Sequence, residues 1–370
     1  METIDVGAGY SLLAFLVALT VLVFVHEMGH YLVARFFNVR VDVFSIGFGP
    51  EVWGRQAKSG TRWRISAIPL GGYVKFFGDS NAASAPSSEK PEMSDEDKKV
   101  CFQYKPLGQR AAIVAAGPIV NFIFAIVIFA GLFTIYGKPV TTSDIATVVE
   151  GSAADMAGIK PGDKITAIDG DSVESFNDIR KHVGLNTGNV MVFLIERDYS
   201  SIEISLIPDL SKTTDRFGNE YDVRRLGIGS QSVEVKELGP LSALGEGVKD
   251  TISMTKMMMT SLGQIIMGTR SIDELGGPVK IAQTAGESAS MGLVSFVMFM
   301  ALISINLGMV NLFPIPMLDG GHLLFYGMEA VMRKPVSARL QEIGYMAGFV
   351  LFITLMIFLT WNDIIGRTGG

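Results

Sequence analysis

The chain has 370 residues, of which 48% are hydrophobic and 18% are charged, and its formal net charge is -6. So few charges in so apolar a chain exclude an ordinary soluble protein, and the acidic balance gives no reason to expect a nucleic acid as partner. The single cysteine, Cys101, allows neither a disulfide framework nor a cysteine-based metal site. The composition therefore favours a membrane protein surrounded by the lipid bilayer.

Four stretches are long and apolar enough to cross the hydrocarbon core of a bilayer, which takes about 20 residues of helix. They comprise residues 10–34, 111–136, 291–313 and 345–361. The first stretch lacks a basic region before it and a small-residue cleavage site after it, so it should remain in the protein and not be removed as a signal peptide. The sequence thus predicts a polytopic α-helical membrane protein with four transmembrane helices.

The distribution of basic residues predicts the orientation of these spans, because cytoplasmic loops are rich in Lys and Arg. Residues 1–9 contain no Lys or Arg, whereas residues 35–110 and the link between spans three and four are rich in them. Those two basic segments are expected on the inner side. The N-terminus, the segment between spans two and three, and the C-terminus are then expected on the outer side.

The segment between spans one and two has two parts. Residues 40–79 alternate short apolar and β-branched runs with glycines, which predicts a membrane-associated β-hairpin region. Residues 80–109 begin with a stretch rich in Ser, Ala, Pro and charged side chains that has little to bury, which predicts a flexible cytoplasmic linker.

A compact α+β domain is predicted at residues 140–231, in the outer segment. Its expected strands are 145–149, 164–168, 190–197 and 202–207, and its expected helices are 153–157 and 176–183. The stretch GSAADMAGIKPGDKITAIDGDSV, which begins at Gly151, resembles PDZ domains of bacterial envelope proteases. The later run LGIG is either a peptide-binding loop of such a domain or a plain strand and turn. Residues 241–267 have apolar side chains at helical spacing, which predicts a helix on the membrane, a helix docked against the spans, or an ordinary packed helix.

The motif His26-Glu27-Met28-Gly29-His30 lies inside the first predicted span. On a helix, residues i and i+4 share a face, so both imidazoles can bind one metal ion while Glu27, about 100° around the axis, can act on a water molecule. A lone histidine is more often a satisfied core residue than a ligand. Inside a span, however, an ionisable group costs about 2.5 to 3.5 kcal/mol, so such groups persist mainly where they line a cavity, pair or bind something. The motif therefore predicts a zinc site.

A catalytic zinc ion usually has three protein ligands and one open position, so one ligand is still missing. The predicted orientation places His182 on the outer side and leaves Asp319, His322 and Glu329 near the inner end of span three. Two prolines and two glycines interrupt the apolar run NLFPIPMLDGGH at 311–322, which predicts a broken helix that lines a cavity. From the residues alone, Asp319 and His322 are both candidates for the third ligand.

Three motifs together resemble the site-2 protease family: HEMGH at 26–30, GPIVNF at 117–122 and NLFPIPMLDGGH at 311–322. With the outer domain, nearly the whole chain is similar to the RseP-type bacterial branch of regulated intramembrane zinc metalloproteases. The resemblance implies Zn2+ as cofactor. It also implies ligand and catalytic roles, with His26, His30 and Asp319 as zinc ligands, Glu27 as catalytic base and Asn311 holding the substrate backbone. In one departure, the enterobacterial form has two tandem PDZ domains and this chain has room for one.

The same resemblance implies a location and a set of partners. The protein would lie in the bacterial cytoplasmic (inner) membrane, with the N-terminus, the PDZ domain and the C-terminus periplasmic and the active site near the cytoplasmic side. Its substrates would be single-span membrane proteins such as anti-sigma factors, or signal-peptide remnants, trimmed beforehand by an upstream site-1 protease. The hairpin region resembles a membrane-embedded β-element that offers an edge to an extended substrate.

Two rival functions belong to other classes. A non-catalytic PDZ membrane scaffold has no need of Glu27, because a structural zinc site does not use that carboxylate. A metal sensor or transporter would need acidic or histidine side chains along several spans, which the sequence lacks.

The predicted organisation divides the chain into eight segments. They are 1–39, the first transmembrane helix with HExxH; 40–79, the β-hairpin region; 80–109, the flexible linker; 110–139, the second transmembrane helix; 140–231, the PDZ domain; 232–290, an amphipathic helical linker; 291–323, the third transmembrane helix with the LDG motif; and 324–370, a cytoplasmic loop and the fourth transmembrane helix.

Overall fold

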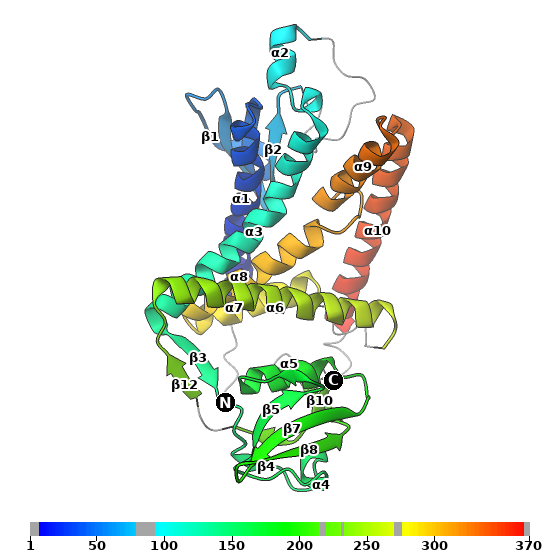
Figure 1. The fold of residues 1–370 in the computed structure, drawn as a ribbon. Coiled ribbons are helices and arrows are strands. Elements are labelled where there is room, and N and C mark those ends of the chain that lie inside the picture. Colours follow the sequence, from blue (N-terminus) through cyan, green and yellow to red (C-terminus); the bar gives the residue numbers. More distant parts are fainter. Residues whose placement is uncertain (1–6, 79–92, 215–219, 231–232, 270–275, 366–370) are drawn as a thin grey trace. The chain divides into compact units, whose positions relative to one another are not determined.

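A computed structural model describes residues 7–78, 93–214, 220–230, 233–269 and 276–365 (Figure 1). The chain divides into two units. The span-bearing unit comprises residues 2–128 and 277–361, and the inserted unit comprises residues 129–276 together with residue 1 and residues 362–370. Each unit is described by itself.

Within the described residues, four helices are long and apolar enough to cross a membrane. They are α1 (Ala8–Phe36), α3 (Leu107–Tyr136), α8 (Leu293–Asn311) and α10 (Ala338–Ile365). The four long apolar helices predicted from the sequence are therefore confirmed. The side chains of α10 are mostly exposed and apolar, among them Phe349, Val350 and Leu351. Such a surface is stable where the surroundings are hydrocarbon and not water.

Small residues let the helices of the span-bearing unit approach closely. Ala14 and Ala18 of α1 pack against Ala285 of α7 (Pro278–Ser290) and Phe299 of α8. A Cβ atom at Gly286 of α7 would lie within 2.6 Å of the Ser11 Cα atom of α1, so only glycine fits there. The sequence predicted a helical linker at α7, and the structure packs that helix against the first span.

The predicted hairpin region is a single twisted sheet made by β1 (Val41–Gln56) and β2 (Arg62–Phe76). Residues 43–46 of β1 pair on one side with residues 62–65 and on the other side with residues 72–75. The far end of β1, residues 51–56, pairs with the remaining side of residues 62–66. In the described part of the chain no strand pairs with the outer side of residues 72–76, which are therefore an edge.

The predicted flexible linker is only partly tested, because residues 79–92 lie outside the described residues. The prediction is wrong for residues 95–104, since α2 (Asp95–Val100) and a 3-10 turn, η1 (Phe102–Tyr104), are ordered. Ser94 caps α2 by accepting from the Asp97 backbone N–H. Cys101 is buried and Phe102 stacks on Phe76, so this stretch does have apolar groups to bury.

The inserted unit contains a four-stranded antiparallel sheet in the order β6-β5-β7-β8. The strands are β5 (Lys164–Ile168), β6 (Asp171–Ser172), β7 (Met191–Arg197) and β8 (Ser200–Leu206). Strands β5 and β7 contribute the inward-facing side chains Ile165, Ile168, Phe193 and Ile195 to the core. Helices α4 (Ala153–Met156) and α5 (Phe176–Leu185) pack against these side chains and complete the core. The alternating burial of β7 explains why this part was predicted within a few residues.

Three strand pairs differ from the prediction. β4 (Thr147–Val148) is shorter than expected and pairs with β11 (Ile228–Gly229), so the LGIG run forms a strand. β9 (Asp209–Thr214) pairs with β10 (Glu220–Arg225), a hairpin that the sequence analysis did not predict. β3 (Lys138–Thr141) pairs with β12 (Val233–Lys236), so the helical linker predicted from residue 232 begins as a strand and becomes helical only at α6 (Pro240–Ile266).

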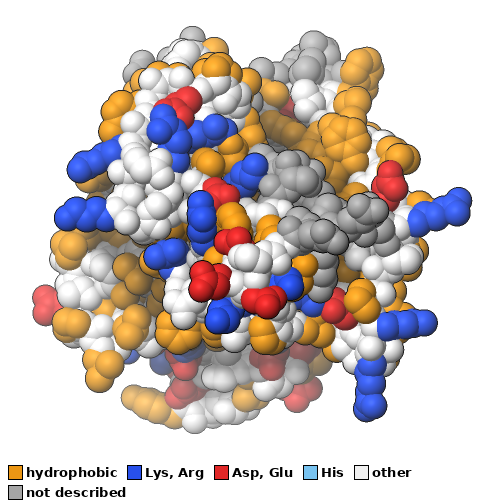
Figure 2. All heavy atoms as spheres, turned by 90° about the horizontal axis from the view of Figure 1, so that it is seen from above, with side chains coloured by type: hydrophobic (Ala, Val, Ile, Leu, Met, Phe, Trp, Pro, Cys, Tyr) orange, Lys and Arg blue, Asp and Glu red, His pale blue; other side chains and the backbone are white. Residues whose placement is uncertain are grey.

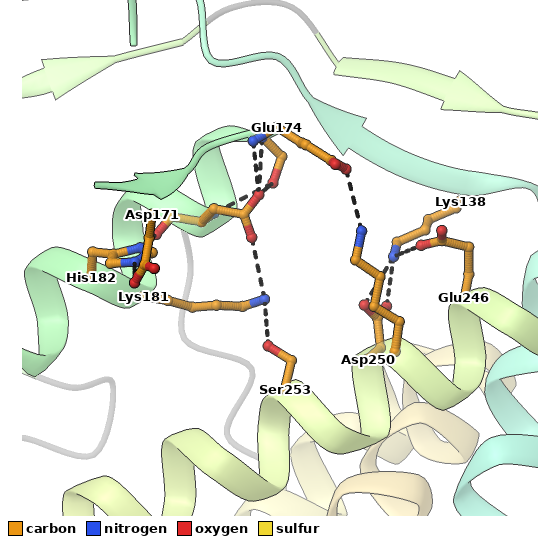
Figure 3. A network of polar contacts seen from close by, with 11 residues as sticks. Lys138, Asp171, Glu174, Lys181, His182, Glu246, Asp250 and Ser253 are labelled. Carbon is orange, nitrogen blue, oxygen red and sulfur yellow. Dashed lines mark hydrogen bonds and ion pairs between the residues drawn. The ribbon is translucent and has the colours of Figure 1, made fainter. Parts of the chain in front are cut away.

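Polar contacts join α6 to the rest of the inserted unit (Figure 3). Lys138 Nζ lies 2.8 Å from Glu246 and 2.9 Å from Asp250, and Lys249 lies 3.3 Å from Glu174. Lys181 Nζ of α5 donates to Ser253 Oγ at 3.1 Å. Burial lowers the pKa of Lys138, but the two carboxylates outweigh burial and the pKa is raised. The lysine therefore stays charged and links β3 to α6.

One ion pair of the inserted unit has an almost completely buried carboxylate. Arg197 donates through Nε and Nη2 to the two oxygens of Asp163, at 2.6 and 2.7 Å, and the Lys160 backbone N–H donates to the same carboxylate at 2.8 Å. Burial raises the pKa of Asp163, but the contacts with Arg197 and Lys160 outweigh it and hold the pKa below its usual value. The folded unit thus stabilises the ionised carboxylate.

We expect Asp163→Asn to destabilise the inserted unit by on the order of 3 kcal/mol, because it removes the negative charge that is paired with the Arg197 guanidinium. In the wild type this contribution is complete above the usual Asp pKa of about 3.9 and is lost as the pH falls through the lower folded value. Hydrogen exchange of β5 and β7 in the detergent-solubilised chain measures both effects. Asp171→Asn is the matched control, because the Asp171 side chain is 78% exposed. Equal exchange in the two variants would contradict a stabilising role for the pair.

Candidate metal centre

Helix α1 positions two histidines on one face. His26 and His30 are separated by one helical turn, and their Nε2 atoms are 3.2 Å apart. The helix passes very close to α3 at this level, because a Cβ atom at Gly29 would lie 2.9 Å from the Ala116 carbonyl carbon. A Cβ at Gly117 would fall on the His30 ring and lie 2.9 Å from His26 Cε1. The two glycines therefore make the space in which both imidazoles point toward α3.

A break between α8 and α9 (Asp319–Met332) positions the third side chain. Asp319 is the first residue of α9, directly after a turn at residues 312–318 in which Met317 has a positive φ of 96°. A Cβ at Gly320 would lie 2.5 Å from the Leu312 carbonyl carbon, and one at Gly321 would lie 2.5 Å from the Ile315 carbonyl oxygen. The glycines after Asp319 let the chain fold back tightly enough to present the carboxylate. The predicted third helix is thus divided in two.

These elements bring His26, His30 and Asp319 together, with one ligand atom from each within 4.8 Å of the others. Asp319 Oδ2 lies 3.1 Å from His26 Nε2 and 3.5 Å from His30 Nε2. A tetrahedral zinc ion with ligand distances of about 2.0 to 2.1 Å needs donor atoms about 3.3 Å apart. The observed spacings of 3.1 to 3.5 Å fit that requirement. All three side chains are at most 17% exposed.

The second ring nitrogens of the histidines are also engaged. His30 Nδ1 lies 2.9 Å from the Ile113 carbonyl oxygen, to which only a protonated Nδ1 can donate. This leaves Nε2 of His30 as the nitrogen with the free lone pair, the state that a metal ligand requires. His26 Nδ1 lies 3.1 Å from the side-chain amide of Asn121, a fully buried residue of α3.

Glu27 faces the β-sheet. The Val74 backbone N–H of β2 is a hydrogen-bond partner of its carboxylate. A Cβ at Gly72 would lie 3.3 Å from Glu27 Cγ and 2.8 Å from Val23 Cγ1, so glycine lets the edge strand pass directly against α1. The carboxylate therefore lies between the ligand cluster and the edge formed by residues 72–76.

The remaining predicted candidates lie elsewhere. Tyr345 OH of α10 lies 3.0 Å from His322 Nδ1. Glu329 is 2.7 Å from Arg110 Nη2, an ion pair between α9 and α3. In the inserted unit, His182 is 3.4 Å from Asp171. Of the two third-ligand candidates left open by the residues alone, the geometry brings Asp319 into the cluster.

Asn311 is the last residue of α8 and is partly exposed, and its predicted substrate role stays a prediction. Asn121 is the residue at the cluster that the sequence analysis did not single out for a role. An uncharged amide in an otherwise apolar span four residues after Gly117 was the available signal.

Comparison with known proteins connects this geometry to a family. The model of Peptidase family M50 matches residues 14–355. An Agrobacterium fabrum protein named "Putative zinc metalloprotease" is 44% identical over 377 residues, which cover 100% of both chains. The Metalloprotease MmpA of Caulobacter vibrioides is 35% identical over 383 residues, 97% of this chain and 96% of its own. A Rickettsia conorii protein that is also named as a "Putative zinc metalloprotease" is 37% identical over 358 residues, 96% of this chain and 98% of its own.

We expect Gly117→Ala to lower zinc affinity at least about tenfold, because the added methyl group displaces both imidazoles and ligand geometry tolerates errors of only about 0.2 Å. Competition with a chromophoric chelator measures the affinity. Gly131→Ala on the same helix is the control, since a Cβ there meets nothing within 4 Å. Wild-type affinity in Gly117→Ala would show that the cluster does not hold the metal.

Proposed function

Since the chain belongs to peptidase family M50 and is a zinc metalloprotease, we propose that it hydrolyses peptide bonds within the membrane-spanning segments of single-span proteins. The chain is an integral membrane protein. The observation that carries the proposal is the position of the cluster: two of its three donors, and the candidate base, project from the apolar helix α1. A substrate must enter that apolar bundle to be cut.

We propose His26, His30 and Asp319 as the residues that hold zinc. When bound, zinc supplies Lewis-acid chemistry, since it acidifies a water molecule and polarises a carbonyl group. Glu27 is on the same helix as two ligands but outside the cluster, which suits a general base that accepts the proton of the attacking water. Asn311, at the end of α8, is the proposed contact for the substrate backbone.

The edge strand supports a way of binding the substrate. No described strand pairs with the outer side of residues 72–76, and the Val74 N–H on that strand is within hydrogen-bonding reach of Glu27. An unwound substrate segment that adds to this edge as a further strand would lie against the general base. Unwinding is required because peptide bonds within a helix are already hydrogen-bonded and sterically shielded.

The proposed substrates are anti-sigma factors or signal-peptide remnants that an upstream protease has shortened. For the orientation, we propose a cytoplasmic (inner) membrane protein with the active site near the cytoplasmic side. The support comes from the basic residues, because Lys and Arg side chains are spread over the face of the span-bearing unit that carries α2 (Figure 2).

We propose that residues 140–231 of the inserted unit are a PDZ domain that screens substrates and performs no chemistry. The small sheet with α4 and α5, together with the GSAADMAGIKPGD stretch, supports this assignment. Its one histidine, His182, is paired with Asp171, and the three proposed zinc ligands belong to the span-bearing unit. A groove of such a domain can bind an extended chain end or exclude bulky ones.

Purified protein should contain about one zinc ion per chain and should cleave a labelled single-span peptide. A chelator that removes the zinc should abolish this cleavage. We expect Glu27→Gln to keep the zinc and abolish cleavage, because the amide cannot accept a proton. Asp319→Ala should lose both the zinc and the cleavage activity, whereas His322→Ala should retain measurable turnover. Zinc loss in a folded Glu27→Gln chain, or the reverse ranking of Asp319 and His322, would contradict the assigned roles.

The inactive Glu27→Gln chain also tests substrate binding at the edge strand. With Cys101 replaced by alanine, Lys75→Cys on the edge should form disulfides with a single cysteine placed near the scissile bond of the peptide. Arg55→Cys, on the opposite edge of the same sheet, is the matched control. Equal cross-linking at both positions would remove the support for strand addition.

Thr141 and Val233 are paired neighbours, so replacing residues 142–232 by an Asn-Gly turn should preserve the ribbon of β3 and β12. We expect this variant to keep zinc and to cut a minimal transmembrane peptide at a rate near that of the wild type. It should also accept substrates that still carry a large folded outer domain. A folded, zinc-loaded variant that cannot cut the minimal peptide would show that the removed segment contributes to catalysis.

A further inference from the structure

The two histidines of the cluster are held by different kinds of partner. His30 Nδ1 donates to the carbonyl oxygen of Ile113, a backbone group that can only accept. His26 Nδ1 lies 3.1 Å from Nδ2 of Asn121, a side-chain amide that can either donate or accept. The backbone carbonyl therefore fixes the state of the His30 ring, whereas an amide that can turn decides the state of the His26 ring.

A neutral imidazole that binds a metal through Nε2 must carry its proton on Nδ1. That proton needs an acceptor. With Nδ2 of Asn121 presented to His26, two donors would face each other once His26 binds the metal. The same arrangement leaves Oδ1 of Asn121 buried without a hydrogen-bond partner. Rotating the amide by 180° exchanges the two atoms and presents an acceptor to His26.

We propose that Asn121 is a positioning residue whose Oδ1 accepts a hydrogen bond from His26 Nδ1–H and so directs the Nε2 lone pair of His26 at the metal. The proposal rests on the ligand set proposed above. Asn121 touches no reacting atom, and its effect is exerted through the imidazole.

The surroundings of Asn121 suit such a role. Its side chain is completely buried, so solvent does not provide an alternative acceptor for His26. Ser304 Oγ of α8 donates to the Asn121 main-chain oxygen at 2.8 Å, which fixes α3 against α8 at this level. A Cβ at Gly308, one turn further along α8, would lie 3.0 Å from the Pro118 carbonyl oxygen. The backbone that carries the amide is thus held in place, and only the amide itself has two orientations.

Zinc affinity of three variants tests the proposal in the full-length, detergent-solubilised chain. Asn121→Leu and Asn121→Ala remove the acceptor, and we expect both to weaken zinc binding about 10 to 100-fold. Asn121→Asp keeps an acceptor, and we expect zinc binding within a few-fold of wild type and an unchanged visible spectrum after cobalt substitution. Unfolding temperature and elution volume serve as the check on folding.

A purely structural role for Asn121 predicts the opposite order. Leucine has the same branching and the same number of side-chain heavy atoms as asparagine and is apolar, so it would be the mildest change, and aspartate would be the most damaging because it buries a charge. Zinc affinity in Asn121→Asp no better than in Asn121→Leu and Asn121→Ala would therefore overturn the proposal. The alanine variant retains this test if leucine prevents folding.

His26→Ala separates failure of this inference from failure of the ligand assignment. If His26→Ala keeps wild-type zinc affinity, the ligand set itself is wrong. If His26→Ala loses zinc while Asn121→Leu and Asn121→Ala bind it as tightly as wild type, the ligand set stands and the role of Asn121 is wrong.

Discussion

Close packing of α1 against α3 is the constraint on which the rest of the centre depends. Two imidazoles, a carboxylate and an amide are buried in a largely apolar bundle, and such groups are stable there only when they satisfy one another. Gly29 and Gly117 bring the helix axes close enough for this. His30 can then reach the Ile113 carbonyl oxygen and His26 can reach Asn121. A larger residue at either glycine would separate the donors from their partners.

The turn between α8 and α9 is also closely packed, and it brings the third polar group to the histidines. It carries Asp319 to within 3.5 Å of both histidines, and the helix break exposes backbone groups that need partners inside the protein. Gly320 and Gly321 allow those backbone groups to pack against one another. Gly348 of α10 adds support, because a Cβ there would lie 2.9 Å from the Pro316 carbonyl carbon. The fourth span thus braces the turn that presents the carboxylate.

Within the span-bearing unit, the β-sheet places the polar backbone groups of an edge strand beside the centre. Its edge at residues 72–76 lies beside Glu27, and Gly72 permits the close approach to α1. Edge strands normally attract other strands, which is a hazard in most proteins. Here the same property suits a protease that has to hold an unwound segment in an extended form. The inserted unit has its own core and its own buried ion pair, so its stability can be changed by substitutions such as that at Asp163 without altering the ligands.

The sequence by itself determined what short-range patterns encode. Runs of about 20 apolar residues predicted four long apolar helices, the i, i+4 spacing of His26 and His30 predicted a shared ligand face, and alternation predicted the strands β5, β7 and β8. The sequence did not determine which residues far apart in the chain come into contact. Asp319 and His322 are three residues apart and equally suited to bind metal by type, and only the tertiary structure decided which one reaches His26. The edge position of residues 72–76, the pairing of β3 with β12, and the contact of Asn121 with His26 were likewise decided by long-range packing. Periodicity predicts which face of a helix or strand is apolar, but it does not predict which other element packs against that face.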